Sequence, residues 1–456
     1  MKKINLPKQN SCKIAILGLG YVGLPLALEI ARIKKCLKTS QALDRKIIGF
    51  DINKIRIKEL INKKNKSELI SNQKSLDEFI NLTFTSELKD LTNCEVFIVA
   101  VPTPIDNARR PDFSALKSAC ELIGKVLFQK NNDKTRTERS DPIIIFESTV
   151  YPGATEEICV PILESISKLN SNLNGGFFYG YSPERINPGD LEHQISSIKK
   201  IVSGSNNDVA NWLENFYGSF IYAGIHLARC IKVAEAAKVI ENTQRDLNIA
   251  LINELAVICD LLKIDTSEVV DAASTKWNFH DFRPGLVGGH CIGIDPYYLT
   301  HKAEKLGYHP EVVLAGRRIN DNMSKWLSQK LLLELSKRNL LNKDSEILIL
   351  GFTYKANCPD VRNSQISNVI NIINTYNIKT YTVDPVADKE SAIKIYNQNV
   401  SDNVPFGKKF SAVLLAVAHE DFLRITEKEW EDLIFEGGFL FDLCNTIPRS
   451  LNPLRI

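Results

Sequence analysis

Short apolar runs alternate with amphipathic stretches over the first 150 residues. The apolar runs are KIAIL (13–17), KIIGFD (46–51), EVFIVAVP (95–102) and PIIIFESTV (142–150). Their length and their content of branched side chains predict buried strands. Helical patterns separate them at 22–34, from residue 53 onward and near 113–127. Strands that alternate with helices predict βαβ units and a parallel sheet covered on both faces.

The same alternation returns near the C-terminus, with a predicted helix at 364–376. The apolar runs there are SEILILGF (345–352), IKTYTVDP (378–385), FSAVLLAVA (410–418) and GGFLFDLCN (437–445). Between the two regions, residues 227–263 lack Gly and Pro and are rich in Ala, Leu, Ile, Glu and Lys. This segment predicts one long helix, a candidate spine and dimer interface. The predicted fold class is α/β, with two doubly wound Rossmann-like domains joined by a long central helix.

Composition and charge narrow the class of protein. The 456 residues are 44% hydrophobic and 24% charged, as in ordinary globular proteins, and the length indicates two or three domains. A net charge of only +3 argues against a nucleic-acid partner. No apolar run is long enough to span a bilayer, so we expect no membrane partner and a cytoplasmic location.

The ten cysteines are scattered singly and form no C-x-x-C pair. This spacing disfavours a disulfide scaffold or a structural zinc site, and we expect no metal. Cys94, Cys159, Cys230 and Cys259 lie in apolar sequence and are expected to fill the core.

A glycine-rich turn, Gly18-Leu19-Gly20-Tyr21-Val22-Gly23, follows the first predicted strand and opens a helix. In that context the glycines allow a tight turn, a close approach to a pyrophosphate and close packing of helix on strand, and the helix N-terminus favours phosphate. Asp51 ends the second strand, where a carboxylate can accept hydrogen bonds from ribose hydroxyls and repel a 2′-phosphate. Its distance from the glycines exceeds the usual spacing of about 20 residues. A loop insertion at 34–46 accounts for the excess.

A second glycine-rich segment, GGHCIGID (288–295), carries Cys291 and Asp295. Lys238 and Asn242 lie four residues apart on the predicted long helix and so share one face. Taken alone, that pair fits a solvated helix edge. Together the four side chains could converge at the mouth of a nucleotide-binding sheet, as covalent catalysis requires. Cys291 could also be a metal ligand or inert filler, but the ligand spacing and the flexible glycines disfavour both.

Motifs in this order resemble those of the UDP-glucose/GDP-mannose dehydrogenase family over nearly the whole chain. They are GLGYVGLPLA (18–27), VPTP (101–104), ESTVYPG (147–153), YSPERINPGD (181–190), AEAAKVIENTQRDLNIALINELA (234–256), FRPGLVGGHCIGIDPYYL (282–299) and GFTYKANCPDVRNS (351–364). The residues within these motifs resemble those of the branch that oxidises UDP-N-acetylhexosamines. The other branches usually read GGSC, with a lysine before the aspartate and a second glutamate after the first. Here those positions are His290, Ile294 and Pro188.

The resemblance implies an NAD-dependent oxidation of the sugar C6 alcohol to a carboxylate, with two NAD consumed per sugar. It implies an NAD-binding Rossmann domain at 1–208 and a central helical domain with the cysteine loop and dimer interface at 209–325. A UDP-sugar-binding Rossmann-like domain would follow at 326–456. A homodimer or a larger homo-oligomer is expected, with a product used for surface polysaccharide such as capsule or O-antigen.

The resemblance also implies a role for individual residues. Cys291 would form a thiohemiacetal and then a thioester, Glu184 would be the base of hydrolysis, and Asp295 would orient Lys238 or hold water. The expected catalytic residues are Cys291, Lys238, Asn242, Glu184, Asp295 and Thr149. The expected cofactor-binding residues are Gly18, Gly20, Tyr21, Val22, Gly23, Asp51, Arg56, Thr103, Thr149 and Arg362. The expected substrate-binding residues are Glu184, Arg185, Lys238, Asn242, Arg283, His290, Arg317 and Lys355, of which His290 and Arg317 would sense the N-acetyl group.

Three alternatives remain open from the sequence. A UDP-glucose 6-dehydrogenase would use the same chemistry on another sugar. A two-electron β-hydroxyacid dehydrogenase would need neither the cysteine nor the second doubly wound region. A non-enzymatic NAD-binding sensor would leave the cysteine loop without a purpose. The number of NADH formed per sugar separates these classes of protein. Oxidation of C6 to a carboxylate gives two, a β-hydroxyacid dehydrogenase gives one, and a sensor gives none.

Overall fold

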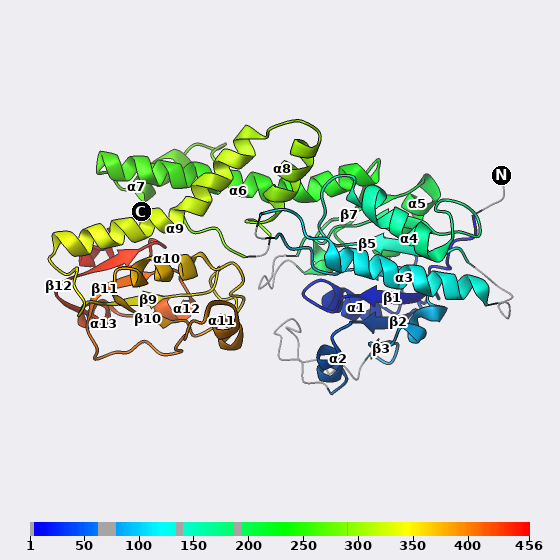
Figure 1. Ribbon diagram of the computed structural model, residues 1–456, viewed down its shortest axis with the longest axis horizontal. Helices are drawn as coiled ribbons and strands as arrows, with labels where there is room; N and C mark the ends of the chain where they lie inside the picture. The colour runs from blue at the N-terminus through cyan, green and yellow to red at the C-terminus, as the bar shows by residue number, and fades with distance from the viewer. Residues whose placement is uncertain (1–3, 63–78, 107, 134–139, 187–193, 290) are drawn as a thin grey trace. The chain divides into compact units, whose positions relative to one another are not determined.

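A computed structural model describes residues 4–62, 79–106, 108–133, 140–186, 194–289 and 291–456. The chain forms two compact units, Met1–Ile240 with Tyr297–Leu306 and Glu241–Pro296 with Gly307–Ile456. Each unit contains one sheet with helices packed on it (Figure 1). The fold is therefore α/β with two doubly wound units, as the alternation of runs predicts. The three-domain division at 208 and 325 stays a prediction.

The first unit is built on an eight-stranded sheet of order β3-β2-β1-β4-β5-β6-β7-β8. The strands are β1 (Lys13–Leu17), β2 (Lys46–Phe50), β3 (Leu82–Thr85), β4 (Val96–Val99), β5 (Ile143–Phe146), β6 (Phe178–Tyr181), β7 (Lys200–Gly204) and β8 (Ile225–Leu227). Neighbouring strands are parallel except β6 and β7. The first six follow the strand order of dinucleotide-binding Rossmann folds, in which the order reverses between β1 and β4. Ligands of such sheets bind at the carboxyl ends of the strands beside this reversal.

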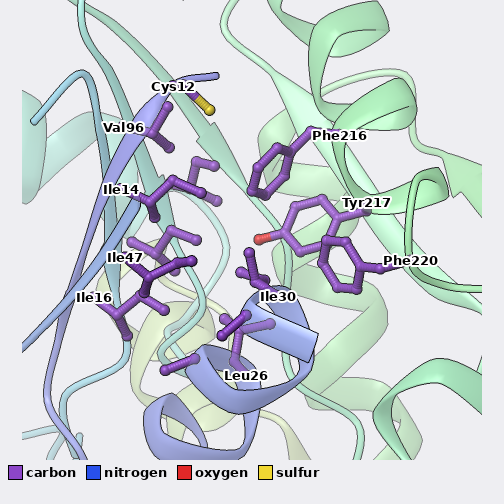
Figure 2. Close-up of a cluster of buried hydrophobic side chains, with 14 of the residues drawn as sticks. Cys12, Ile14, Ile16, Leu26, Ile30, Ile47, Val96, Phe216, Tyr217 and Phe220 are labelled. Carbon is purple, nitrogen blue, oxygen red and sulfur yellow. The ribbon is translucent and has the colours of Figure 1, made fainter. Parts of the chain in front are cut away.

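Helices cover both faces of this sheet. On one face, α1 (Gly23–Arg32) and α5 (Asn207–Gly218) pack against Ile14, Ile16 and other inward side chains. Figure 2 shows those strand residues facing aromatic side chains of α5. The alternate strand residues, such as Ala15 and Leu17, are buried on the opposite face. The remaining helices of the unit are α2 (Lys54–Ile61), η2 (Leu88–Asn93), α3 (Ser114–Asn132), η3 (Thr155–Cys159), α4 (Val160–Ser167) and η4 (Ile195–Ser197).

The predicted long helix is confirmed as α6 (Ile231–Leu262), although it begins four residues later than its apolar pattern. Leu227 instead ends β8, since the edge strand takes up the first apolar residues of that segment. Three helices follow that the sequence pattern did not resolve: α7 (Thr266–Ser274), α8 (Asp295–Lys305) and α9 (Glu311–Lys337).

The second unit is built on a five-stranded parallel sheet of order β10-β9-β11-β12-β13. The strands are β9 (Glu346–Leu350), β10 (Lys379–Val383), β11 (Phe410–Leu415), β12 (Ile434–Asp442) and β13 (Leu454–Arg455). Alternate side chains of β9 enter two separate apolar clusters. Ile347 and Ile349 belong to one cluster, and Leu348 and Leu350 belong to the other. This is the flavodoxin-like strand order, whose ligand crevice lies where the order reverses, at the ends of β9 and β11.

The helices of the second unit supply the partners of those two clusters. α9 and α10 (Gln365–Asn374) pack into the cluster with Ile347, and α12 (Glu420–Leu423) and α13 (Glu427–Asp432) into the other. The remaining helices are α11 (Lys389–Tyr396) and η5 (Arg449–Leu451). The sheet is therefore doubly wound.

The expected core cysteines divide. Cys94, Cys159 and Cys259 are buried, but Cys230 is exposed, so that prediction is wrong for Cys230. Cys230 precedes the first turn of α6, where its backbone carbonyl accepts helix hydrogen bonds while its side chain faces out. Within the described residues, no helix is both long and apolar enough to cross a membrane.

Candidate active site

The glycine turn joins β1 to α1, and each glycine has a distinct surrounding. Gly18 has a φ of +92°, and a Cβ there would lie 2.8 Å from the carbonyl oxygen of Ala100. A Cβ on Gly23 would lie 1.9 Å from the carbonyl oxygen of Gly18, so only glycine lets helix and turn pack this closely. A Cβ on Gly20 would meet nothing within 4 Å. The turn is thus closed at its two ends and open in the middle, where a pyrophosphate would approach the backbone.

Asp51 lies beside this turn in spite of its distance in sequence. β2 pairs with β1 in a register that matches Phe50 to Leu17, so the next residue reaches the turn. The Leu19 N–H donates to Asp51 Oδ2 at 2.9 Å, and the Asn53 N–H donates to Oδ1 at 2.9 Å. The carboxylate therefore stands at the end of β2, where a ribose would lie next to a bound pyrophosphate. The glycine turn and Asp51 fit NAD.

The other predicted cofactor residues surround the same edge of the first sheet. Arg56, on α2, donates from Nε to the Leu19 carbonyl at 3.4 Å. The Thr103 hydroxyl, after β4, donates to the carbonyl of Thr149, after β5, at 2.7 Å. The Tyr298 hydroxyl donates to the Thr103 carbonyl. Tyr21 is exposed and Val22 is half-buried on the turn itself. The structure thus brings the N-terminal part of the predicted set together.

Glu184, the predicted hydrolytic base, follows β6 and is buried against a lysine. Its Oε1 accepts hydrogen bonds from the N–H groups of Arg185 and Ile186, and its Oε2 accepts one from Lys200 Nζ at 2.9 Å. Burial alone would raise the pKa of this carboxyl, but the Lys200 charge and the backbone donors hold it below its usual value. Glu184 is therefore ionised at neutral pH.

In the second unit, the cysteine loop lies against the segment that follows β9. The Gly289 N–H donates to the Arg362 carbonyl at 3.2 Å, and Asn363 Nδ2 donates to the Gly289 carbonyl at 3.0 Å. Gly289 has a φ of +81°, and a Cβ there would lie 2.9 Å from the Tyr354 ring. Both glycine conformation and close approach are thus required here. Cys291 is half-buried, and its carbonyl accepts the Asp295 N–H at 2.8 Å.

Asn242 and Asp295 meet within the second unit. Asn242 Nδ2 donates to Asp295 Oδ2 at 2.6 Å, and both side chains are buried. The carboxylate fixes the amide orientation, and the second Nδ2 hydrogen can still donate to another acceptor. Lys238, one turn earlier on α6, is also buried. The solvated helix edge, which a lone Lys and Asn favour, is therefore wrong for both residues.

The predicted substrate contacts have varied surroundings. Arg185 donates to the Lys199 carbonyl at 2.7 Å, and Arg362 forms an ion pair with Asp360 at 2.6 Å. Arg283 is exposed and pairs with two aspartates, and Lys355 is half-buried. Arg317 is buried in an ion pair with Asp246 at 2.6 Å. His290 lies outside the described residues.

A cluster at the ligand edge of the second sheet has no counterpart in the sequence analysis. Asp384, His419 and Thr353 follow β10, β11 and β9 and are fully buried. His419 Nε2 lies 3.0 Å from Asp384 Oδ2 and 3.1 Å from Thr353 Oγ1, and its Nδ1 accepts the Asn357 N–H. Because Nδ1 faces a backbone donor, Nε2 is the ring nitrogen that can donate to Asp384. The cluster fixes the loop that carries Lys355. In the sequence, the only sign of this cluster is that Thr353, Asp384 and His419 come at or just after the ends of apolar runs.

The reversal of strand order beside the open glycine turn, together with Asp51, defines a dinucleotide-binding protein of the doubly wound class. A half-buried cysteine on a glycine loop adds a group suited to covalent chemistry.

The chain belongs to the UDP-glucose/GDP-mannose dehydrogenase family. Family models match the NAD binding domain at residues 12–221, the central domain at 232–322 and the UDP binding domain at 348–449. The chain is thus an NAD-dependent nucleotide-sugar dehydrogenase with NAD as its cofactor and a UDP-binding domain. The resemblance seen in the motifs is confirmed.

Individual relatives agree with the family. The chain is 48% identical to a UDP-N-acetyl-D-glucosamine 6-dehydrogenase of Pseudomonas aeruginosa over 97% of this chain and 99% of the relative. It is 46% identical to a protein of the same name from Salmonella typhi, over 97% and 98%. The solved UDP-D-ManNAc dehydrogenase of Pyrococcus horikoshii is 28% identical, with a TM-score of 0.81 over 97% of this chain and 99% of that one.

Proposed function

We propose that this enzyme oxidises C6 of a UDP-N-acetylhexosamine, UDP-GlcNAc or UDP-GalNAc, to the uronic acid. Two relatives that are 48% and 46% identical over nearly their whole length carry the name UDP-N-acetyl-D-glucosamine 6-dehydrogenase. The half-buried Cys291 on its glycine loop is the single observation that carries the covalent, four-electron reaction. The gluco and galacto epimers differ in one axial hydroxyl, and both remain candidates.

The glycine turn and Asp51 would hold NAD, which would supply the hydride acceptor for each of the two oxidations. The first oxidation takes the C6 alcohol to an aldehyde, with the alcohol proton released. The Cys291 thiolate then adds to C6 of the aldehyde, and the aldehyde oxygen takes up a proton to give a thiohemiacetal. Loss of a hydride and a proton gives the thioester, and water cleaves its C–S bond to give the carboxylate and the free thiol.

Lys238 and Asn242 are proposed to stabilise the oxygen that gains negative charge during each hydride loss. An ammonium and an amide N–H are suitable donors, and removal of one such donor typically costs on the order of 10²–10³ in rate. The Asn242–Asp295 hydrogen bond at 2.6 Å supports this role because it fixes the amide before substrate binds. Asp295 is proposed to orient these donors, and the Lys238 charge to favour the Cys291 thiolate.

Glu184 is proposed to accept the proton of the water that hydrolyses the thioester. Its ionised state supports the role, because a base must be deprotonated before it acts. Thr149 is proposed to position water and to contact the nicotinamide. Arg362 is proposed to lie near the nicotinamide end of the cofactor.

The nucleotide sugar is proposed to bind at the ends of β9 and β11, where the strand order of the second sheet reverses. Lys355, on the loop fixed by the Asp384–His419 cluster, is proposed to contact the pyrophosphate. Arg185 and Arg283 are proposed as further contacts with phosphate or sugar. His290 and Arg317 are proposed to distinguish N-acetyl from hydroxyl at C2.

We further propose a homodimer or larger homo-oligomer that associates through α6. Leu251, Ile258 and Leu262 recur at spacings of seven and four residues, which places them on one face of the helix. They are 61%, 47% and 62% exposed in the single chain. A stripe of three large apolar side chains in water favours burial against a second copy.

The cytoplasm is the proposed location, because all ten cysteines are free thiols. The product would serve surface polysaccharide synthesis.

Intact-mass spectrometry of two cysteine variants tests the covalent step. Cys291→Ser should form no uronate and no covalent sugar adduct, whereas Cys230→Ser, a change at an exposed cysteine, should behave as the wild type. Uronate formation at the wild-type rate by Cys291→Ser would refute the covalent mechanism.

A further inference from the structure

A buried group of four polar side chains surrounds Lys200 in the first unit. Lys200 Nζ donates to Glu147 Oε2 at 2.7 Å and to Glu184 Oε2 at 2.9 Å. The Tyr217 hydroxyl donates to the other oxygen of Glu147. The Lys200 ammonium also lies 5.4 Å from the centre of the Tyr217 ring. All four side chains are at least nine-tenths buried.

The strand topology explains how a lysine comes to lie here. Glu147 and Glu184 follow β5 and β6, at the carboxyl edge of the sheet. β7 runs antiparallel to β6, so Lys200, its first residue, lies at the same edge. Tyr217 belongs to α5, and Figure 2 shows its hydroxyl pointing from the helix toward the strands. Three strands and one helix thus deliver one ammonium and two carboxylates to a single buried place.

The two carboxylates are not equivalent. Burial raises the pKa of Glu147, and the nearby Glu184 charge adds to the rise, against the Lys200 charge. For Glu184, burial also acts to raise the pKa, but Lys200 and two backbone N–H donors outweigh it and the pKa is lowered. The two carboxylates also raise the pKa of Lys200 above its ordinary value, against its burial. An additional proton therefore goes to Glu147 before Glu184.

We propose that Lys200 is a positioning residue for the reaction, which holds the Glu184 carboxylate ionised and fixed for thioester hydrolysis while Glu147, with Tyr217, holds Lys200. This inference rests on the proposed role of Glu184 as the hydrolytic base. Lys200 itself touches no substrate in this scheme. It acts on the rate of the second half-reaction only through the protonation state and the position of Glu184.

The charges around Glu184 support an effect of Lys200 in particular. The Lys200 charge is the largest influence that lowers the pKa of Glu184, and the Lys200 ammonium donates to Glu184 Oε2 at 2.9 Å. Lys200 is therefore the cation that offsets the burial of Glu184. Without it, only the backbone N–H donors of Arg185 and Ile186 would oppose the rise in the pKa of Glu184 that burial causes.

A matched pair of variants isolates the lysine. Glu147→Gln and the double variant Glu147→Gln/Lys200→Met differ only at position 200. The double variant keeps the formal charge of the cluster, because one carboxylate and one ammonium are removed together. Lys200→Arg is the conservative variant that retains a cation. Uronate release is measured from pH 5 to pH 9, with KM for the UDP-sugar and the first hydride transfer measured on the same samples.

In the double variant, the acid limb of uronate release should move to higher pH than in Glu147→Gln. Each pH unit of displacement lowers the rate about tenfold below the limb. KM and the first hydride transfer should change less than threefold, and Lys200→Arg should keep the acid limb of the wild type. A uniform loss of rate at every pH, with acid limbs that superimpose, would overturn the proposal.

Two measurements on Glu184 complete the test without a change at Lys200. Glu184→Gln should accumulate the Cys291 thioester. If it releases uronate as the wild type does, Glu184 is not the base and both the proposed role and this inference fail. If it accumulates thioester but the acid limbs above superimpose, only this inference fails. The infrared difference between wild type and Glu184→Gln should show an ionised carboxylate at pH 6, and a protonated carboxyl there would contradict the proposal even if the double variant does not fold.

Discussion

Glu235 makes the stability of the first unit depend on pH in a way that can be worked out. This residue of α6 is fully buried, and its carboxylate accepts the backbone N–H groups of Gly153 and Thr155. Burial raises its pKa from the ordinary value of 4.5 to about 7, with the two N–H donors partly offsetting the rise. It therefore fixes the loop that follows Thr149, one turn before Lys238 on the same helix.

The pKa shift sets the sign and the size of the effect. Between pH 4.5 and pH 7 the folded chain holds a proton on Glu235 that the unfolded chain has lost. The free energy of unfolding therefore falls as pH rises through this window and changes no further well above pH 7. At 1.36 kcal/mol per pKa unit, the loss from pH 5 to pH 8 is about 2.5 kcal/mol.

Glu235→Gln removes the titration and keeps the shape of the side chain. Its amide loses one hydrogen bond to the loop, a constant cost of about 1–3 kcal/mol at every pH. Urea unfolding followed by circular dichroism at pH 5 and pH 8 should show the wild type losing about 2.5 kcal/mol more than the variant between the two pH values. Equal losses in the two proteins would refute the assignment of a raised pKa to Glu235.

Two further substitutions test the two glycine segments. Asp51→Asn removes the charge that would accept hydrogen bonds from the ribose hydroxyls of NAD. A lost charged hydrogen bond of about 1.5–3 kcal/mol should raise KM for NAD roughly 10- to 150-fold and shrink the preference over NADP. An unchanged KM in steady-state kinetics with both cofactors would contradict this role. Gly289→Ala puts a Cβ 2.9 Å from the Tyr354 ring at a φ of +81°. Uronate formation should therefore fall at least about tenfold, and the midpoint of unfolding should be lowered. Wild-type activity would show that the cysteine loop tolerates a different conformation.

The strands that the sequence predicts correctly are the ones whose burial is evident from their own residues. Runs such as KIAIL and FSAVLLAVA are apolar at nearly every position; the first forms β1 and the first six residues of the second form β11. Strand β7 is one of the strands outside the predicted apolar runs. It begins with Lys200, a residue that argues against a buried strand when it is seen alone. Its burial depends on carboxylates 16 and 53 residues away in the sequence. A single sequence does not show such pairing.

The candidate site also contains residues that a local motif predicts and residues that only the folded chain brings together. Glycine roles at Gly18 and Gly23 follow from a local motif, and the open surroundings of Gly20 agree with it. Asp51 has unusual spacing, yet strand pairing brings it to the turn because the insertion, apart from its last residue Lys46, precedes β2. The Asp384–His419 contact joins residues 35 apart, at the ends of two strands that are not sheet neighbours. Only the three-dimensional strand order brings them together.

We propose that this enzyme removes four electrons from C6 of a UDP-N-acetylhexosamine through Cys291. The most direct measurement is the number of NADH formed per sugar, for UDP-GlcNAc, UDP-GalNAc, UDP-Glc and GDP-Man, with the product identified by mass. We expect two NADH and a uronate from UDP-GlcNAc or UDP-GalNAc, and much slower turnover of the other two sugars. One NADH per sugar with an aldehyde as the final product, or preferred turnover of UDP-Glc, would contradict it.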